Sequence, residues 1–186
     1  MQRLPPGSHG IPADVVARNQ RERLIAAIVE VCAERGYARA SVTEVAARAG
    51  VSSLTFYKQF AGKEDCLLAA HRQLLGRLLE EVDRAVAGEA VEGGSESKVE
   101  ARVTLRTVLT VFAADSPSAR LLTVEVLAAG PEGVKRHDAT VEAFAVRLGV
   151  DWIRAAGLLA LIGKLVAADE AERLPQLEDE LAGTLS

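Results

Sequence analysis

The chain of 186 residues has a formal net charge of -4 at pH 7, with 49% hydrophobic and only 4% aromatic residues. Its length allows one small domain of about 50 to 60 residues and a larger one of about 120. The net charge excludes a protein that coats nucleic acid nonspecifically, and the scarcity of strand patterns predicts an all-α fold.

Charge is distributed unevenly along the chain. Residues 1–60 hold eight Lys or Arg against five Asp or Glu, whereas residues 61–186 hold fourteen against twenty-one. A mildly basic first part on an acidic second part suits a protein that meets DNA with one end only.

The first predicted helix begins at Pro12, a residue favoured in the first turn, and its apolar residues recur at helical spacing until it ends near Gly36. This helix contains Cys32, and the second cysteine, Cys66, lies far away in another apolar helical pattern. That arrangement predicts reduced core thiols rather than a disulfide or a metal site.

The segment that begins at Ser41 has the start and stop signals of two short helices joined by a tight turn. Ser41 and Glu44 have the S-x-x-E spacing of a capping box, which predicts the start of a helix. Gly50 should end that helix, because glycine takes the left-handed conformation at little steric cost. Ser52 or Ser53 can then cap the second helix.

This second helix has two different faces. Phe56 and Phe60 are four residues apart and should anchor its inner face. The outer face is short, polar and rich in hydrogen-bond donors, as contact with phosphates and base edges requires. Its residues are Ser53, Leu54, Thr55, Tyr57, Lys58 and Gln59.

A set of residues at fixed spacing extends beyond these two helices. It begins with Gly36 and Tyr37, ends with Lys63 and Glu64, and includes Ala46, Gly50, Val51, Ser52, Thr55, Tyr57 and Phe60. Together these residues resemble the N-terminal domain of the TetR family of bacterial transcriptional regulators. The resemblance implies a three-helix DNA-binding domain with a helix-turn-helix, followed by a helical domain for effector binding and dimerisation.

Within this motif we predict how each side chain contacts DNA. Tyr57 and Thr55 donate hydroxyl groups to phosphates, and Lys58 adds a positive charge. Ser53 and Leu54 lie nearest to base edges, and Leu54 either touches a thymine methyl or packs against the neighbouring helix. Free backbone N–H groups at the start of the following helix also favour an anion. The full predicted set is Thr43, Ser52, Ser53, Leu54, Thr55, Tyr57, Lys58 and Lys63.

The helices of the second part are separated by glycine, proline and acidic residues. The first should start at residues 63–65 and reach Gly88, and a loop follows around Gly93. Further helical patterns occupy 98–114, 118–129, 132–148, 152–168 and 175–184. The predicted domains are therefore a DNA-binding domain at 1–62 and an effector-binding and dimerisation domain at 63–186.

The last two predicted helices carry a wide apolar stripe. It fits either a core helix within one chain or a four-helix bundle between two chains, and the resemblance favours the bundle because family members pair through their last two long helices. A homodimer sets two recognition helices about 34 Å apart, as a palindromic operator requires. The predicted interface residues are Leu158, Leu161, Ile162, Leu165, Leu177 and Leu181.

Other apolar positions of the second domain fit either plain core or the lining of an effector pocket. Two histidines are candidate polar groups for such a pocket. The residues are His71, Leu75, Leu79, Leu105, Leu109, Phe112, Leu122, Val126, His137, Phe144 and Trp152. They predict a small, largely apolar effector whose identity the sequence does not define.

An enzyme is disfavoured because the histidines are scattered and no HExxH, GxSxG or phosphate-binding glycine loop occurs. No metal or cofactor is predicted. Without a signal peptide or a bilayer-spanning apolar run, the protein is expected in the cytoplasm. We therefore predict a repressor that binds a palindromic operator as a homodimer and is released by a ligand. The alternative is a helical DNA-binding regulator that has no small-molecule effector and is controlled by a protein partner or by its own concentration.

Overall fold

The computed structural model describes residues 12–89 and 96–183. Within these ranges every regular element is a helix, which confirms the all-α prediction. Residues 1–11 of the predicted DNA-binding domain and the predicted loop around Gly93 lie outside the described residues. None of the described helices combines the length and the apolar character needed to cross a membrane.

The chain divides into two compact units, Met1–Ala70 (unit 1) and His71–Ser186 (unit 2). The division falls inside the helix α4 (Lys63–Gly88), later than the boundary after residue 62 that the sequence suggested. The first turns of α4 belong to the core of unit 1, where the Cys66 Sγ lies 3.7 Å from the carbonyl oxygen of Leu24.

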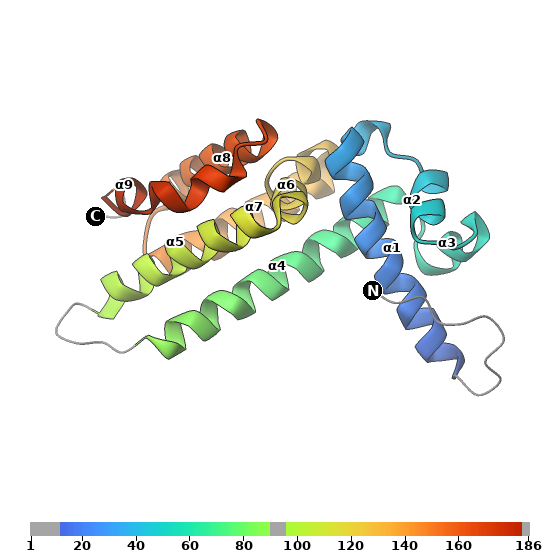
Figure 1. The fold of residues 1–186 in the computed structure, drawn as a ribbon, viewed down its shortest axis with the longest axis horizontal. Helices are drawn as coiled ribbons and strands as arrows, with labels where there is room; N and C mark the ends of the chain where they lie inside the picture. Colours follow the sequence, from blue (N-terminus) through green and yellow to red (C-terminus); the bar gives the residue numbers. More distant parts are fainter. Residues whose placement is uncertain (1–11, 90–95, 184–186) are drawn as a thin grey trace. The chain divides into compact units, whose positions relative to one another are not determined.

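Unit 1 is a cluster of short helices on one long helix. Its elements before α4 are α1 (Ala13–Arg35), η1 (Tyr37–Arg39), α2 (Val42–Arg48) and α3 (Ser53–Gln59). Helix α1 packs against both α2 and α3, as Figure 1 shows. The apolar stripe of α1 supplies buried residues such as Leu24 and Ile28, and Val45 and Phe56 meet this core from α2 and α3. The predicted three-helix arrangement is therefore present.

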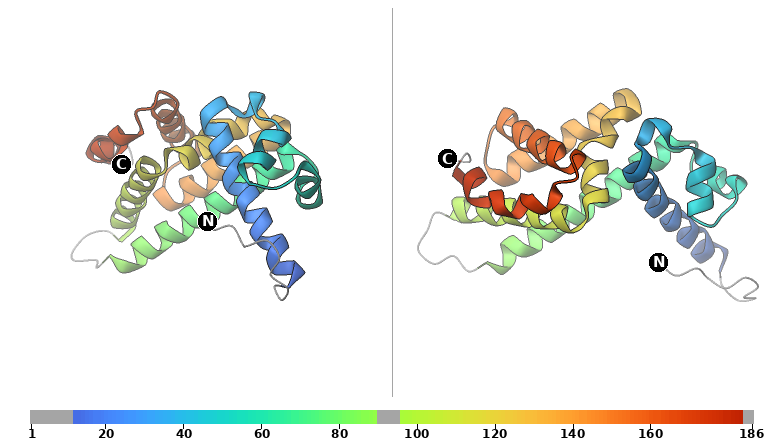
Figure 2. Two further views of the ribbon diagram at one scale, coloured as in Figure 1. Left: turned by 45° about the vertical axis from the view of Figure 1, so that its right-hand side comes forward. Right: turned by 45° about the horizontal axis from the view of Figure 1, so that its top comes forward.

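Unit 2 is a layered bundle of longer helices. Besides the rest of α4 its elements are α5 (Glu96–Ala114), α6 (Ser116–Thr123), η2 (Glu125–Ala129), α7 (Gly130–Leu148), α8 (Trp152–Ala167), η3 (Ala171–Leu177) and α9 (Glu178–Ala182). Helix α7 packs against α5 and α8, and α8 also covers α6, an arrangement visible in Figures 1 and 2. Leu109, Phe112, Phe144 and Leu159 are buried at the centre of this bundle.

Two predicted helices of unit 2 differ from the structure. The pattern 118–129 is broken at Val124, after which η2 runs so close to α7 that only glycine fits at position 133 beside the Val126 carbonyl. The pattern 175–184 becomes η3 followed by the five-residue α9. Pro175 lies inside η3, where its ring and its missing N–H disfavour an α-helix that would continue through this position. The expectation of a long final helix is therefore wrong.

Candidate nucleic-acid interface

The helix α2 is held at its start by the predicted capping box. The backbone N–H of Glu44 donates to Ser41 Oγ at 3.2 Å, and the backbone N–H of Ser41 donates to Glu44 Oε2 at 3.2 Å. Both groups would otherwise lack a helical partner. The box therefore determines where α2 begins and leaves Thr43 exposed on its first turn.

The turn between α2 and α3 uses the predicted glycine. Gly50 has φ 63°, and the N–H of Val51 donates to the carbonyl of Ala46 at 2.9 Å. Of the two serines considered for the cap of α3, the structure uses Ser52, whose Oγ accepts from the N–H of Thr55 at 3.1 Å. These contacts determine the angle at which α3 leaves α2.

The helix α3 buries one face and exposes the other. Phe56 is completely buried and its ring centroid lies 5.7 Å from that of Phe60. Leu54 and Tyr57 are 69% and 58% exposed, and Lys58 is exposed beside them at helical spacing. Ser53 and Thr55 are half-buried at the edges of this face. One exposed surface thus presents a hydroxyl, an ammonium group and an apolar side chain.

Two arginines of α1 hold this surface in place, and the sequence did not suggest this role for them. Arg21 Nη1 donates to the carbonyl of Gln59 at 2.6 Å, and its guanidinium lies 4.1 Å from the centroid of the Phe60 ring. Arg23 Nη2 donates to the carbonyl of Ala49. Each arginine binds the carbonyl end of a helix, where a positive charge is favourable. The acceptors are backbone oxygens distant in sequence, which no side-chain pattern reveals.

The side chain of Lys63 is occupied within unit 1. Its Nζ donates to the carbonyls of Tyr37 at 3.0 Å and Ala40 at 3.1 Å, with Ala38 at 3.4 Å, and lies 4.4 Å from the centroid of the Tyr37 ring. An ammonium group has three protons to donate, and these three carbonyls accept them, so the Lys63 side chain is not available to a phosphate. The backbone N–H groups at the start of α4 stay the predicted phosphate contact, as the sequence suggested for Lys63.

The predicted pocket residues mostly lie in the core of unit 2. Six are fully or almost fully buried: Leu105, Leu109, Phe112, Leu122, Val126 and Phe144. Leu75, Leu79 and His137 are half-buried, whereas Trp152 is exposed at the start of α8. A surface pocket of about 450 Å³ in unit 2 is lined by a different set of residues from α5, α7 and α9. The structure therefore does not gather the predicted residues around this pocket.

His71 is buried, and its hydrogen bonds define its tautomer. Thr140 Oγ1 donates to the carbonyl of Arg136 at 3.0 Å, so it accepts from His71 Nε2 at 3.2 Å. His71 Nδ1 has no hydrogen-bond partner among the described residues. Burial, with smaller contributions from the charges of Arg136 and His137, lowers the pKa of His71 to about 4. The ring is therefore neutral at pH 7.

The predicted interface residues differ in exposure. Ile162 and Leu181 are buried in the core of the same chain. Leu158, Leu165 and Leu177 are half-buried against that core, and Leu161 is exposed. The most exposed apolar residue of α8, Ile153 at 78%, was not in the predicted set. The sequence signal that could have placed Ile153 in the interface is its spacing, since it lies eight residues before Leu161 on the same face of the helix.

The structure offers no arrangement typical of a metal enzyme in the residues it describes, since no group of three or more His, Cys, Asp or Glu could hold a metal ion there. The geometry instead points to unit 1, where α3 is anchored by its inner face and capped at its start. A short helix presented in this way fits the major groove of DNA.

Comparison with known sequences identifies this part of the chain. Residues 24–70 match the family model for bacterial regulatory proteins of the tetR family. The fatty acid metabolism regulator protein of Bacillus subtilis (strain 168) is 35% identical over 68 residues, which are 37% of this chain. That match covers 35% of the relative's own length, so the chain matches about a third of it.

Solved structures share the fold along most of the chain. The fatty acid degradation regulator FadR from Bacillus halodurans has a TM-score of 0.71 at 20% identity, covering 99% of this chain and 96% of that one. FadR from Bacillus subtilis, in complex with stearoyl-CoA, has a TM-score of 0.73 at 21% identity, covering 88% and 96%. A transcriptional regulator from Rhodococcus has a TM-score of 0.65 at 27% identity, covering 89% and 95%. These likenesses establish a two-part helical fold.

Proposed function

Because the chain belongs to the TetR family of bacterial transcriptional regulators, we propose that it is a repressor that binds a palindromic operator as a homodimer. This family is a class of regulators rather than enzymes. The observation that carries the proposal is the exposed face of α3, with Leu54, Tyr57 and Lys58 together opposite the buried Phe56. We expect the protein in the cytoplasm, where its operator lies.

The three exposed side chains of α3 have different roles in the proposal. Tyr57 donates its hydroxyl to a phosphate and Lys58 contributes a charge, and both contacts are independent of base sequence. Leu54 has no polar group, and its exposure favours contact with a thymine methyl over packing against a neighbouring helix. Arg21 holds the end of α3, and Arg23 holds the end of α2 before the turn.

The proposed dimer surface is the outer face of α8. Its inner face is buried in the core through Leu159 and Ile162, yet its outer face also carries apolar residues, with Ile153 and Leu161 on either side of Gly157. Apart from the nearby backbone of α8 itself, no atom of the described residues lies within 4 Å of the position where a Cβ on Gly157 would stand, so another backbone can approach closely there. A second copy of the chain is the proposed occupant, because a palindrome needs two recognition helices.

The proposed effector is a small, largely apolar molecule. A similar fold in FadR from Bacillus subtilis binds stearoyl-CoA, so fatty acyl compounds are the first class to test. Helix α4 starts in unit 1 and continues into unit 2, which makes it the proposed connection between effector and DNA. A typical coupling of about 1 to 3 kcal/mol would weaken DNA binding roughly 5- to 150-fold.

The proposal is tested by selecting fragments of the source genome on the purified full-length chain. We expect recovery of a palindromic sequence, and Leu54→Ala should change the preference at one base position in each half-site. Val134→Ala is the matched control, because Val134 is an exposed apolar residue of unit 2. Recovery of no common sequence would contradict the repressor proposal. Operator binding that no fatty acyl compound or wider apolar library weakens would favour the regulator without a small-molecule effector.

A further inference from the structure

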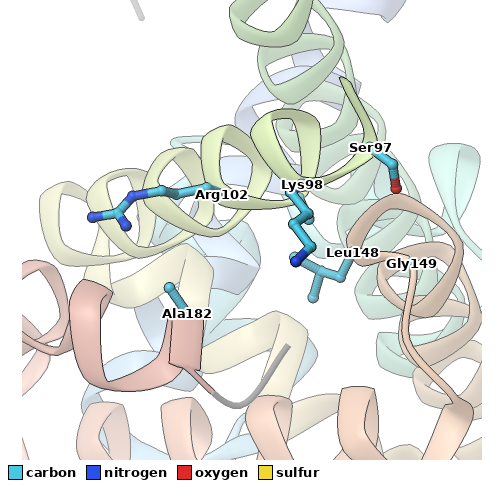
Figure 3. A pocket seen from close by; sticks show the side chains of 7 residues that line it. Ser97, Lys98, Arg102, Leu148, Gly149 and Ala182 are labelled. Atoms are coloured by element: carbon cyan, nitrogen blue, oxygen red, sulfur yellow. The ribbon is translucent and has the colours of Figure 1, made fainter. Parts of the chain in front are cut away.

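A pocket of about 450 Å³ lies at the beginning of α5 in unit 2. Its volume is within the range of small-molecule sites, about 300 to 1,000 Å³. Figure 3 shows that it is formed where the first turns of α5 face the end of α7 and the end of α9. The lining residues are Ser97, Lys98, Ala101, Arg102, Leu148, Gly149 and Ala182.

The polar side of this pocket is positive. Lys98 extends from α5 toward the side of the pocket formed by Leu148 and Gly149 (Figure 3), and it makes no ion pair with any residue that the structure describes. Ser97 adds a hydroxyl group on the same turn. Both residues belong to the first turn of a 19-residue helix, whose N-terminal end favours an anion.

The second cation of the pocket is already neutralised. Arg102 Nε lies 3.3 Å from Glu178 Oε1, and Arg102 Nη2 also contacts Asp179 Oδ1. In Figure 3 the Arg102 side chain points away from Lys98. The two carboxylates outnumber the one guanidinium, so this end of the pocket repels further negative charge. A ligand held by Lys98 alone therefore carries one negative charge rather than several.

The remaining lining is apolar and continuous with the core. Leu148 and Ala101 are both buried, and Leu148 is a member of the central cluster of unit 2. Gly149, with φ 64°, ends α7 in the left-handed conformation and contributes no side chain to the pocket. A Cβ at this position would lie 3.8 Å from Ser97 Oγ, an ordinary van der Waals distance, so Gly149 and the exposed Ser97 are close neighbours in the pocket. An alkyl chain can thus lie against Leu148 while its charged end reaches Lys98.

We propose that this pocket binds a monoanionic amphiphile, namely a medium-chain carboxylate, with the carboxylate on Lys98 and Ser97 and the alkyl chain against Leu148. This inference rests on the proposed ligand response and assigns its effector a site and a charge. A coenzyme A thioester of the same acyl chain carries several phosphate charges, and Glu178 and Asp179 disfavour it at this site.

The test is a calorimetric titration of the full-length chain with sodium octanoate, 1-octanol and octanoyl-CoA. Octanoate should bind more tightly than the other two. Lys98→Ala should weaken octanoate binding about tenfold or more, because a charge-assisted hydrogen bond is lost, and should leave octanol binding unchanged. Lys98→Arg should retain octanoate. Lys135→Ala is the matched control, since Lys135 is an exposed lysine elsewhere in unit 2.

A second variant tests the apolar wall without changing charge. Ala182→Phe should fill the pocket and weaken octanoate and octanol alike. Octanoate binding that survives both Lys98→Ala and Ala182→Phe would overturn the assignment of the site. If octanoyl-CoA binds more tightly than octanoate and this binding depends on Lys98, the proposed preference for a ligand with one negative charge would be overturned. Operator retention is measured on the ligand-free wild type. Its failure would count against the proposed function, whereas the titrations alone decide the pocket.

Discussion

The buried imidazole of His71 makes the stability of unit 2 depend on pH. The ring is 1% exposed and donates from Nε2 to Thr140 Oγ1, and burial lowers its pKa from 6.5 to about 4. In the unfolded chain the same ring takes up a proton near pH 6.5. Between these two values the unfolded state binds more protons than the folded state, so the free energy of unfolding falls as the pH falls.

The size of this effect follows from the difference in pKa. Each pKa unit corresponds to about 1.36 kcal/mol, so His71 should cost unit 2 about 2 kcal/mol between pH 7 and pH 5. The loss should reach about 3 kcal/mol at pH 4, where the folded ring itself begins to take up a proton. Losses of this size are a large part of the total stability of an ordinary domain, about 5 to 15 kcal/mol.

The assay is urea unfolding of wild type and His71→Gln at pH 7, 6 and 5, followed by fluorescence. The chain has one tryptophan, Trp152, which lies in unit 2 and reports on that unit. Glutamine keeps an N–H donor but does not titrate, so the difference between the two proteins isolates the imidazole. The stability of wild type relative to the variant should fall by about 2 kcal/mol from pH 7 to pH 5. A difference constant to within about 0.5 kcal/mol would refute the reasoning.

The other predictions concern DNA contact, stability, assembly and reactivity. Lys58→Ala should reduce the slope of log affinity against log salt by about 2 for a dimer, and an unchanged slope would remove this lysine from the phosphate contacts. Lys63→Met should instead lower the free energy of unfolding by about 1 to 3 kcal/mol in thermal melts followed by circular dichroism, because three carbonyls lose their donor. An unaltered melting curve would show that this contact contributes nothing. Leu161→Glu should sediment as a folded monomer at micromolar concentration while Leu127→Glu, also at an exposed leucine, stays dimeric, and a dimeric Leu161→Glu would argue against the α8 surface. Burial raises the pKa of the Cys66 thiol to about 12, so this cysteine should react with a thiol reagent at neutral pH only after denaturation, and rapid reaction of the native protein would contradict its burial.

Several features of unit 1 were evident from the sequence because each depends on residues close together in the chain. The capping box of Ser41 and Glu44 involves groups three residues apart, and the turn at Gly50 needs only a residue that tolerates a positive φ. The inner face of α3 follows from the spacing of Phe56 and Phe60. Local hydrogen bonding and helical periodicity therefore suffice to predict this helix pair and its outer face.

The contacts of residues whose partners are distant in sequence became evident in the folded chain. The sequence predicts phosphate contact from the backbone at Lys63 but does not reveal that the Lys63 side chain donates to the carbonyls of Tyr37 and Ala40, more than twenty residues earlier in the chain. On α8, Leu161 and Ile162 have the same chemistry and adjacent positions, yet one is exposed and the other is completely buried. An apolar pattern at helical spacing predicts which face of a helix is apolar, but it does not show which other helix buries each residue of that face. That choice depends on how whole helices pack, since burial and electrostatics act between groups that meet only when the chain is folded.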